Sequence, residues 1–198
     1  SRIQPHQLIL SVLAGITTSF IEQSLLNEQP VVRVMPNTSS MIGASATAIA
    51  LGKYVSEDLK KLAEALLGCM GEVYTIQENQ MDIFTGIAGS GPAYFYYLTE
   101  FIEKTGEEAG LDKQLSRSIG AQTLLGAAKM LMETGEHPEI LRDNITSPNG
   151  TTAAGLQALK KSGGGEAISQ AIKHAAKRSK EISEDIEKTA APLSGVIK

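Results

Sequence analysis

The chain has 198 residues, a formal net charge of −4 at pH 7 and an apolar content of 42%. This length allows one large or two small domains, and a weakly acidic chain without a basic cluster is not expected to bind nucleic acid. The single cysteine, Cys69, excludes an intrachain disulfide, and its apolar neighbours predict that it is buried. Apolar runs are too short to span a bilayer, so a cytoplasmic protein without a membrane partner is the default expectation.

The first 77 residues alternate between strand and helix patterns. Strands are predicted over 8–13, 31–35, 44–51 and 73–76, and helices over 17–26 and 57–70. The first two strands are almost wholly apolar, which is typical of strands that are buried on both faces of a parallel sheet. Thr17 or Thr18 and Ser56 are suitable N-caps for the two helices. This order indicates an α/β sheet.

Strand patterns stop after residue 77. Helices are predicted near 79–88, 92–109, 112–134, 138–143, 151–161 and 165–187. Pro92 is expected to interrupt a long helix because it has no N–H and clashes one turn back. The run of basic residues over 173–180 alternates with Ala, which predicts the solvated face of a helix. We therefore place a domain boundary near residue 77, between an α/β domain (1–77) and an all-helical domain (78–198).

A short loop before the predicted helix at 151–161 combines a proline, an Asn-Gly turn and adjacent hydroxyls. Asn149 and Gly150 both tolerate the positive φ of a tight turn. Thr151 or Thr152 is expected to be the N-cap of the helix. Such a loop directs N–H groups and hydroxyls at one point, which suits a carboxylate or phosphate. The alternative interpretation is an ordinary turn before a capped helix.

The same segment resembles the signature of the pyrroline-5-carboxylate reductases, which catalyse the last step of proline synthesis. The matching positions are Ile145, Thr146, Ser147, Asn149, Gly150, Thr152, Gly155, Leu156, Leu159 and Lys160. Four further stretches agree in the same order: 11–15, 33–38, 88–94 and 125–130. The resemblance therefore covers nearly the whole chain.

The resemblance implies the C-terminal portion of a Rossmann-like dinucleotide-binding domain followed by an all-helical dimerisation domain. It also implies a homodimer, with assembly beyond the dimer left open, and NADPH or NADH as the cofactor. The G-x-G-x-x-G fingerprint of such domains does not occur in this sequence, which begins at Ser1. We therefore expect that the first part of the domain is missing and that this chain alone is inactive. The nicotinamide end of the site would use Val12, Leu13, Ala14, Met35, Pro36, Asn37 and, by resemblance alone, Asn144.

The implied reaction reduces 1-pyrroline-5-carboxylate to L-proline by hydride transfer from the nicotinamide to the cyclic imine. It needs a hydrogen-bond donor near the imine nitrogen, and Thr152 is our candidate for this catalytic role. The substrate would be bound by Ser147, Asn149, Gly150, Thr151, Thr152 and, at the predicted domain junction, Glu78. No metal site is expected, because His6, His137 and His174 do not have the spacing of metal ligands.

Two alternatives stay open at this point. The first is a related imine reductase or 3-hydroxyacid reductase. Of these two enzymes, the 3-hydroxyacid reductase would be expected to carry a catalytic lysine. Lys129 is the one tempting candidate, but its sequence neighbourhood is not polar. A non-catalytic helical dimerisation module is the second alternative, and it would not need paired hydroxyls beside an Asn-Gly turn.

Overall fold

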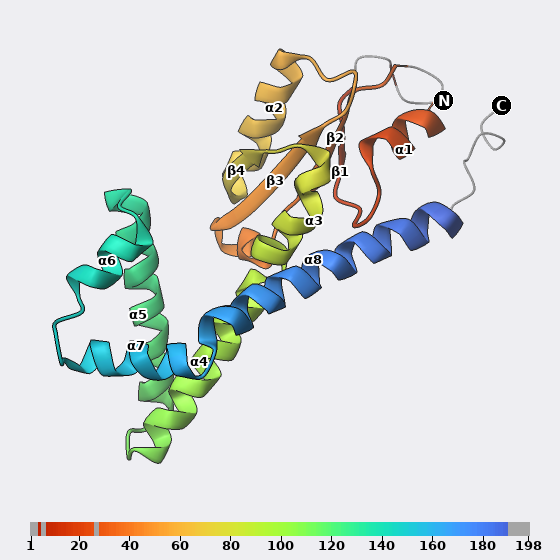
Figure 1. The fold of residues 1–198 in the computed structure, drawn as a ribbon. Helices are drawn as coiled ribbons and strands as arrows, with labels where there is room; N and C mark the ends of the chain where they lie inside the picture. Colours follow the sequence, from red (N-terminus) through yellow and green to blue (C-terminus); the bar gives the residue numbers. More distant parts are fainter. Residues whose placement is uncertain (1–3, 5–6, 26–27, 190–198) are drawn as a thin grey trace. The chain divides into compact units, whose positions relative to one another are not determined.

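The computed structural model describes residues 4, 7–25 and 28–189, and these divide into two compact units. The first unit contains the residues up to Pro92 together with those from Gln170 onward, and the second contains 93–169. Strands occur in the first unit, and the last strand of the described chain ends at Thr75 (Figure 1). The predicted fold class, an α/β part followed by an all-helical part, is confirmed.

The first unit contains a four-stranded sheet in the order β1-β2-β3-β4. Its strands are β1 (Ile9–Ser11), β2 (Val31–Met35), β3 (Ser45–Leu51) and β4 (Gly71–Thr75). The pairs β1–β2 and β3–β4 are parallel, but β2 and β3 are antiparallel, so the sheet is mixed. The parallel pairing of the first two strands agrees with their buried, apolar sequences, whereas a single 3-10 helix, η1 (Thr38–Ile42), and Gly43 at φ 70° turn the chain straight back between β2 and β3. A parallel return would need a longer crossover.

Both faces of this sheet are covered by apolar side chains. On one face, Val32, Val34 and Ile49 pack against α2 (Glu57–Leu67). On the other face, Ala48 and Ala50 pack against α3 (Met81–Phe84). Successive side chains of a strand point to opposite faces, so one strand supplies both layers. All hydrophobic residues that are buried within the described part of the chain belong to this first unit.

The helix caps of the first unit agree with the sequence, but two helix ends do not. Thr17 caps α1 (Thr18–Ser24), and Ser56 caps α2, each by accepting a hydrogen bond from a backbone N–H of the first turn. The first helix ends at Ser24, and residue 26, where it was predicted to end, lies outside the described residues. The second ends at Leu67 and not at Met70, because the tighter 3-10 helix η2 (Gly68–Met70) follows it.

Cys69 lies in η2, and its thiol is exposed. Its Sγ donates to the carbonyl oxygen of Leu66, 3.1 Å away. The prediction that Cys69 is buried was therefore wrong. The chain tightens here from an α-helix to a 3-10 helix, which rotates each residue further around the axis and changes the face on which it lies.

Pro92 explains the irregular helix that joins the two units. The segment runs through η3 (Glu78–Gln80) and α3 into a single π-helical turn, η4 (Thr85–Gly89), and then α4 (Gly91–Glu108). A residue at position 92 would normally donate its N–H to the carbonyl oxygen of Ala88, but proline has no N–H. The Asn37 side chain replaces this missing donor, because its Nδ2 donates to the carbonyl oxygen of Ala88 at 3.1 Å.

The second unit is helical throughout. It contains most of α4 and the helices α5 (Lys113–Thr134), α6 (Pro138–Asn144) and α7 (Thr151–Lys161), while α8 (Gly164–Thr189) begins in it and continues into the first unit. In α5 only Ser116 and Gly120 are buried, and neither α6 nor α7 has a buried residue. Large apolar side chains remain exposed on these helices, among them Phe95, Tyr96, Tyr97, Phe101, Ile119, Leu125 and Met132. One copy of this unit therefore does not enclose an apolar core.

Candidate functional site

The first unit contains a pocket of about 220 Å³ beside the ends of β1 and β2. Its lining consists of Ala14, Gly15, Met35, Thr85, Ser90, Ala175, Arg178, Ser179 and Ile182. The two strands are parallel, so the loops that follow them leave the sheet at the same edge. The carboxyl edge of parallel strands is where α/β sheets bind ligands.

Close backbone contacts at two glycines bring α8 to this edge. Gly15 has φ 77°, and a Cβ atom at this position would lie 3.2 Å from Cα of Ser183. A Cβ atom at Gly86 would lie 2.6 Å from the carbonyl oxygen of Ile172. Any larger residue at Gly86 would meet the α8 backbone, so these glycines allow α8 to form a wall of the pocket.

The predicted cofactor residues gather around this pocket, with one exception. Ala14 and Met35 line it, and Val12 and Leu13 are exposed in the same loop as Ala14. Pro36 is half-buried directly after Met35.

Asn37 also belongs to this group, and its side chain has structural partners. Its Oδ1 accepts from the N–H of Ser39 at 3.0 Å, while its Nδ2 donates to Ala88. The side chain therefore fixes the end of β2 against η4.

Asn144 is the exception, because it lies in the second unit. It lines a separate pocket of about 360 Å³ between α5 and α6, whose walls include Ala127, Met130, Leu131 and Ile145. This lining is mainly apolar, and the proposed cofactor contact of Asn144 stays a prediction.

The α6–α7 loop, residues 145–150, has the tight turn that the sequence predicts. The N–H of Gly150 donates to the carbonyl oxygen of Ser147 at 3.0 Å, and Asn149 has φ 59°. The N-cap of α7 is Gly150, and among the described residues no side chain caps this helix. The prediction that Thr151 or Thr152 is the cap was wrong, because the glycine takes the extended cap conformation and both threonines enter the first turn.

The start of α7 therefore offers donors to an anion. The first N–H groups of a helix have no intrahelical acceptor, and the helix dipole favours negative charge there. Thr151 is exposed and Thr152 is half-buried in this first turn. Ser147, Asn149, Gly150, Thr151 and Thr152 thus lie together, as predicted for a group that binds a carboxylate.

Glu78 has partners of its own in the first unit. Its Oε1 accepts from the N–H of Thr18 at 2.8 Å, and its Oε2 accepts from the Thr18 hydroxyl at 2.6 Å. Nη1 of Arg33 lies 3.5 Å from Oε1. The carboxylate thus already accepts hydrogen bonds from Thr18 and lies beside Arg33, and its contact with substrate stays a prediction.

Two groups of pocket residues were not predicted from the sequence. Arg178 and Ser179 line the pocket at the sheet edge, although we expected the basic residues over 173–180 to face solvent. Ala175, Ser179 and Ile182 follow each other at i, i+4 and i+7, which is the spacing of a single helix face, and this spacing was the available signal.

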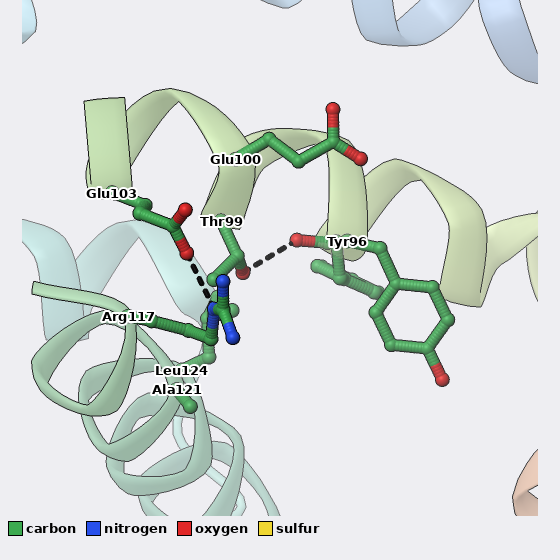
Figure 2. Close-up of a pocket in the computed structure, with 8 residues that line it drawn as sticks. Tyr96, Thr99, Glu100, Glu103, Arg117, Ala121 and Leu124 are labelled. Atoms are coloured by element: carbon green, nitrogen blue, oxygen red, sulfur yellow. Dashed lines mark hydrogen bonds and ion pairs between the residues drawn. The ribbon is translucent and has the colours of Figure 1, made fainter. Parts of the chain in front are cut away.

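A third pocket, of about 440 Å³, lies between α4 and α5 and contains none of the predicted site residues (Figure 2). Glu103 and Arg117 form an ion pair at its edge (Figure 2). The hydrogen bond from Arg117 lowers the pKa of the Glu103 carboxyl and raises the pKa of the guanidinium. No sequence signal links these residues, which lie on different helices.

Two absences can be stated for the described part of the chain. No group of three or more His, Cys, Asp or Glu side chains there could hold a metal ion. His6 lies outside the described residues. No helix there combines the length and the apolarity that crossing a membrane requires.

A pocket at the carboxyl edge of parallel strands is the place where α/β sheets bind ligands such as dinucleotides, and here a helical unit follows the sheet in the chain. Residues 78–182 match the family described as pyrroline-5-carboxylate reductase dimerisation. The chain belongs to the pyrroline-5-carboxylate reductase family, whose members reduce 1-pyrroline-5-carboxylate to proline with NAD(P)H.

Individual relatives agree over almost the whole chain. Pyrroline-5-carboxylate reductase 1 of Bacillus spizizenii is 96% identical over all 198 residues, which span 67% of its length. The solved reductase of Coxiella burnetii has a TM-score of 0.85 at 36% identity and covers 88% of this chain and 65% of its own. The solved Plasmodium falciparum reductase with NADP bound has a TM-score of 0.82 at 32% identity, over 89% of this chain and 71% of its own. The chain spans about two thirds of the length of these relatives.

Proposed function

We propose that the intact protein reduces 1-pyrroline-5-carboxylate to L-proline, with NADPH or NADH as the hydride donor. The observation that carries this proposal is the turn between Ser147 and Gly150, which places two threonine hydroxyls in the uncapped first turn of α7. A related imine reductase stays an alternative, and a 3-hydroxyacid reductase is a weaker one, because Lys129 on α5 lines neither the sheet-edge pocket nor the pocket between α4 and α5.

The residues at the sheet edge fit the nicotinamide end of the cofactor. Ala14 and Met35 would contact the ring, with Val12, Leu13, Pro36 and Asn37 shaping the two loops around it. Small and apolar walls suit a flat ring that must be shielded from water. When bound, the reduced nicotinamide supplies the hydride. The role of the chain there is to orient the ring and exclude solvent.

The α6–α7 loop would bind the substrate. The N–H groups that open α7, with Ser147, Asn149, Gly150 and Thr151, provide donors for the carboxylate without an arginine. The hydroxyl of Thr152 would donate to the imine nitrogen. A threonine hydroxyl is too weak an acid to protonate an imine in bulk water, so it would polarise the C=N bond and relay a proton from solvent or substrate. Correct positioning supplies roughly 7 kcal/mol or more of barrier reduction in favourable cases.

The proposal includes a cytoplasmic homodimer. The exposed apolar side chains of α4 and α5 and the absence of buried residues in α6 and α7 support self-association through the helical unit. Burial of apolar surface is the main driving force of such association.

The test is an assay of the intact protein with 1-pyrroline-5-carboxylate and NADPH or NADH. Loss of dihydronicotinamide absorbance together with formation of L-proline is expected. The matched control substrate is 1-pyrroline, which has the imine but no carboxylate and should react much more slowly. A second control offers 3-hydroxy acids with the oxidised cofactor. Turnover of these acids, or no turnover of 1-pyrroline-5-carboxylate, would contradict the proposal.

A further inference from the structure

Arg33 is a buried arginine with few partners. Its residue is 3% exposed, and its Nε and Nη2 atoms have no hydrogen-bond partner among the described residues. The charged partner that it does have is Glu78, at 3.5 Å. A guanidinium loses much hydration energy on burial, so a buried pair of this kind is weak evidence for added stability, and in some proteins such a pair fixes a geometry instead.

Arg33 and Glu78 connect the two ends of one loop. The β1–α1 loop, residues 12–17, leaves the sheet after Ser11, whose Cα pairs in register with that of Arg33 on the neighbouring strand. It ends at Thr18, whose N–H and hydroxyl both donate to Glu78. The chain Ser11–Arg33–Glu78–Thr18 therefore closes a ring around the loop, although Glu78 lies 60 positions from Thr18 in sequence.

The same loop forms a wall of the sheet-edge pocket. Ala14 and Gly15 line it, while Val12 and Leu13 are 64% and 60% exposed. Exposed apolar residues in a loop gain little from their own packing, so the shape of the loop depends on how its ends are held. Gly15, at φ 77°, has the left-handed conformation that this shape requires.

We infer that Glu78 is a positioning residue, which binds Thr18 and Arg33 and thereby holds the β1–α1 loop in the shape that receives the nicotinamide ring. This inference rests on the proposed function for the identity of the ring. It assigns Glu78 to the cofactor side of the reaction and not to direct contact with the substrate.

The test compares two threonines in the intact protein. Thr18→Val removes the hydroxyl that donates to Glu78, and Thr18→Ser retains one. Thr75→Val is the matched control, because the Thr75 hydroxyl donates to Glu64 at 2.8 Å in the same unit but away from the pocket. Calorimetry measures binding of NADPH and of 2′-phospho-ADP-ribose, which lacks the nicotinamide ring.

Thr18→Val should weaken NADPH binding roughly tenfold or more, as expected for one hydrogen bond to a charged group, and leave 2′-phospho-ADP-ribose binding unchanged. Thr18→Ser should restore NADPH binding, and Thr75→Val should change neither ligand. Equal weakening of both ligands, or no change in either, would overturn the inference. An intact protein that binds NADPH but does not reduce 1-pyrroline-5-carboxylate would remove the proposed function, while the difference between the two ligands would still test the role of Glu78.

Discussion

The N–H of Gly150 donates to the carbonyl oxygen of Ser147 at 3.0 Å, and the two residues touch closely enough that no side chain fits on Gly150 without a shift. A Cβ atom there would overlap the Ser147 hydroxyl and lie 3.1 Å from the Ser147 carbonyl oxygen. The backbone of Gly150 has φ −81°, which alanine adopts without strain. The close contact, and not backbone freedom, is therefore what position 150 requires.

Gly150→Ala should weaken substrate binding with little loss of stability. The new methyl group can be accepted if the Ser147 hydroxyl rotates away and the Ser147 carbonyl oxygen shifts by a few tenths of an ångström. The rotation removes one proposed donor to the substrate carboxylate. Loss of one such bond should raise the KM for 1-pyrroline-5-carboxylate roughly five- to twentyfold. Steady-state kinetics on the intact protein would measure this change, with the KM for the cofactor as an internal reference.

Gly155→Ala is the matched control on the same helix. A Cβ atom at Gly155 meets no atom within 4 Å, and the residue lies inside α7. Alanine in a helix interior is about 0.5–1 kcal/mol more favourable than glycine, so this variant should melt at a slightly higher temperature with an unchanged KM. Equal effects of the two variants on KM would show that the change acts through the helix and not through Ser147.

Self-association should depend on the helical unit. Light scattering on this chain should give twice its mass of 21.0 kDa, because the exposed apolar side chains of α4 and α5 need a second copy to cover them. Ile119→Glu places a charge on α5 and should weaken association at least about tenfold, since a buried unpaired charge costs several kcal/mol.

Leu62→Glu is a suitable control for that variant. Leu62 lies on α2 in the first unit and is 47% exposed, which equals the exposure of Ile119. Its replacement should leave the mass unchanged. A monomeric chain at micromolar concentration, or equal effects of the two substitutions, would refute the assignment of the interface to the helical unit.

The chain by itself should bind NADPH weakly. Its sequence contains no G-x-G-x-x-G, so it has no glycine-rich cradle for the pyrophosphate at a helix N-terminus. The intact Bacillus spizizenii reductase, which is 96% identical over these 198 residues, is the reference. Calorimetric titration of both proteins with NADPH should show a tight site in the reference alone. Equal affinities would mean that the nicotinamide end supplies most of the binding energy.

Local signals in the sequence predicted most elements of this fold. Ser56 and Thr17 are caps because a short hydroxyl can reach the N–H groups of the following turn, and this depends on neighbouring residues alone. The turn at Asn149-Gly150 was likewise predicted. Asn149 has φ 59°, a positive angle that asparagine tolerates, whereas Gly150 at φ −81° does not need that tolerance.

Features that depend on distant residues were not predicted. The antiparallel pairing of β2 and β3 arises because η1 reverses the direction of the chain between them. The apolar pattern of a strand does not by itself determine whether it pairs in a parallel or an antiparallel direction. The hydrogen bonds between Glu78 and Thr18 could not be predicted, because the two residues are remote in sequence. The position of Arg178 in the pocket depends on the packing of α8 against Gly15 and Gly86, which no local pattern of charges shows.

Thr152 should be the most sensitive catalytic position of the intact enzyme. It lies in the first turn of α7, is half-buried, and carries the hydroxyl that we assign to the imine nitrogen. Thr152→Val keeps the shape of the side chain and removes the donor. Loss of one transition-state hydrogen bond should cost about 2–4 kcal/mol, or roughly 30- to 1000-fold in kcat.

Thr151→Val separates this role from simple binding. Thr151 is the exposed neighbour in the same turn, so its hydroxyl is assigned to the carboxylate, and its loss should raise KM more than it lowers kcat. Thermal melts of both variants should match the unmodified enzyme, because neither hydroxyl caps α7. If Thr152→Val folds normally and keeps near-normal kcat, the proton reaches the nitrogen by another path. Bound water would then be the first donor to examine, since both carboxylate oxygens of Glu78 already accept hydrogen bonds from Thr18.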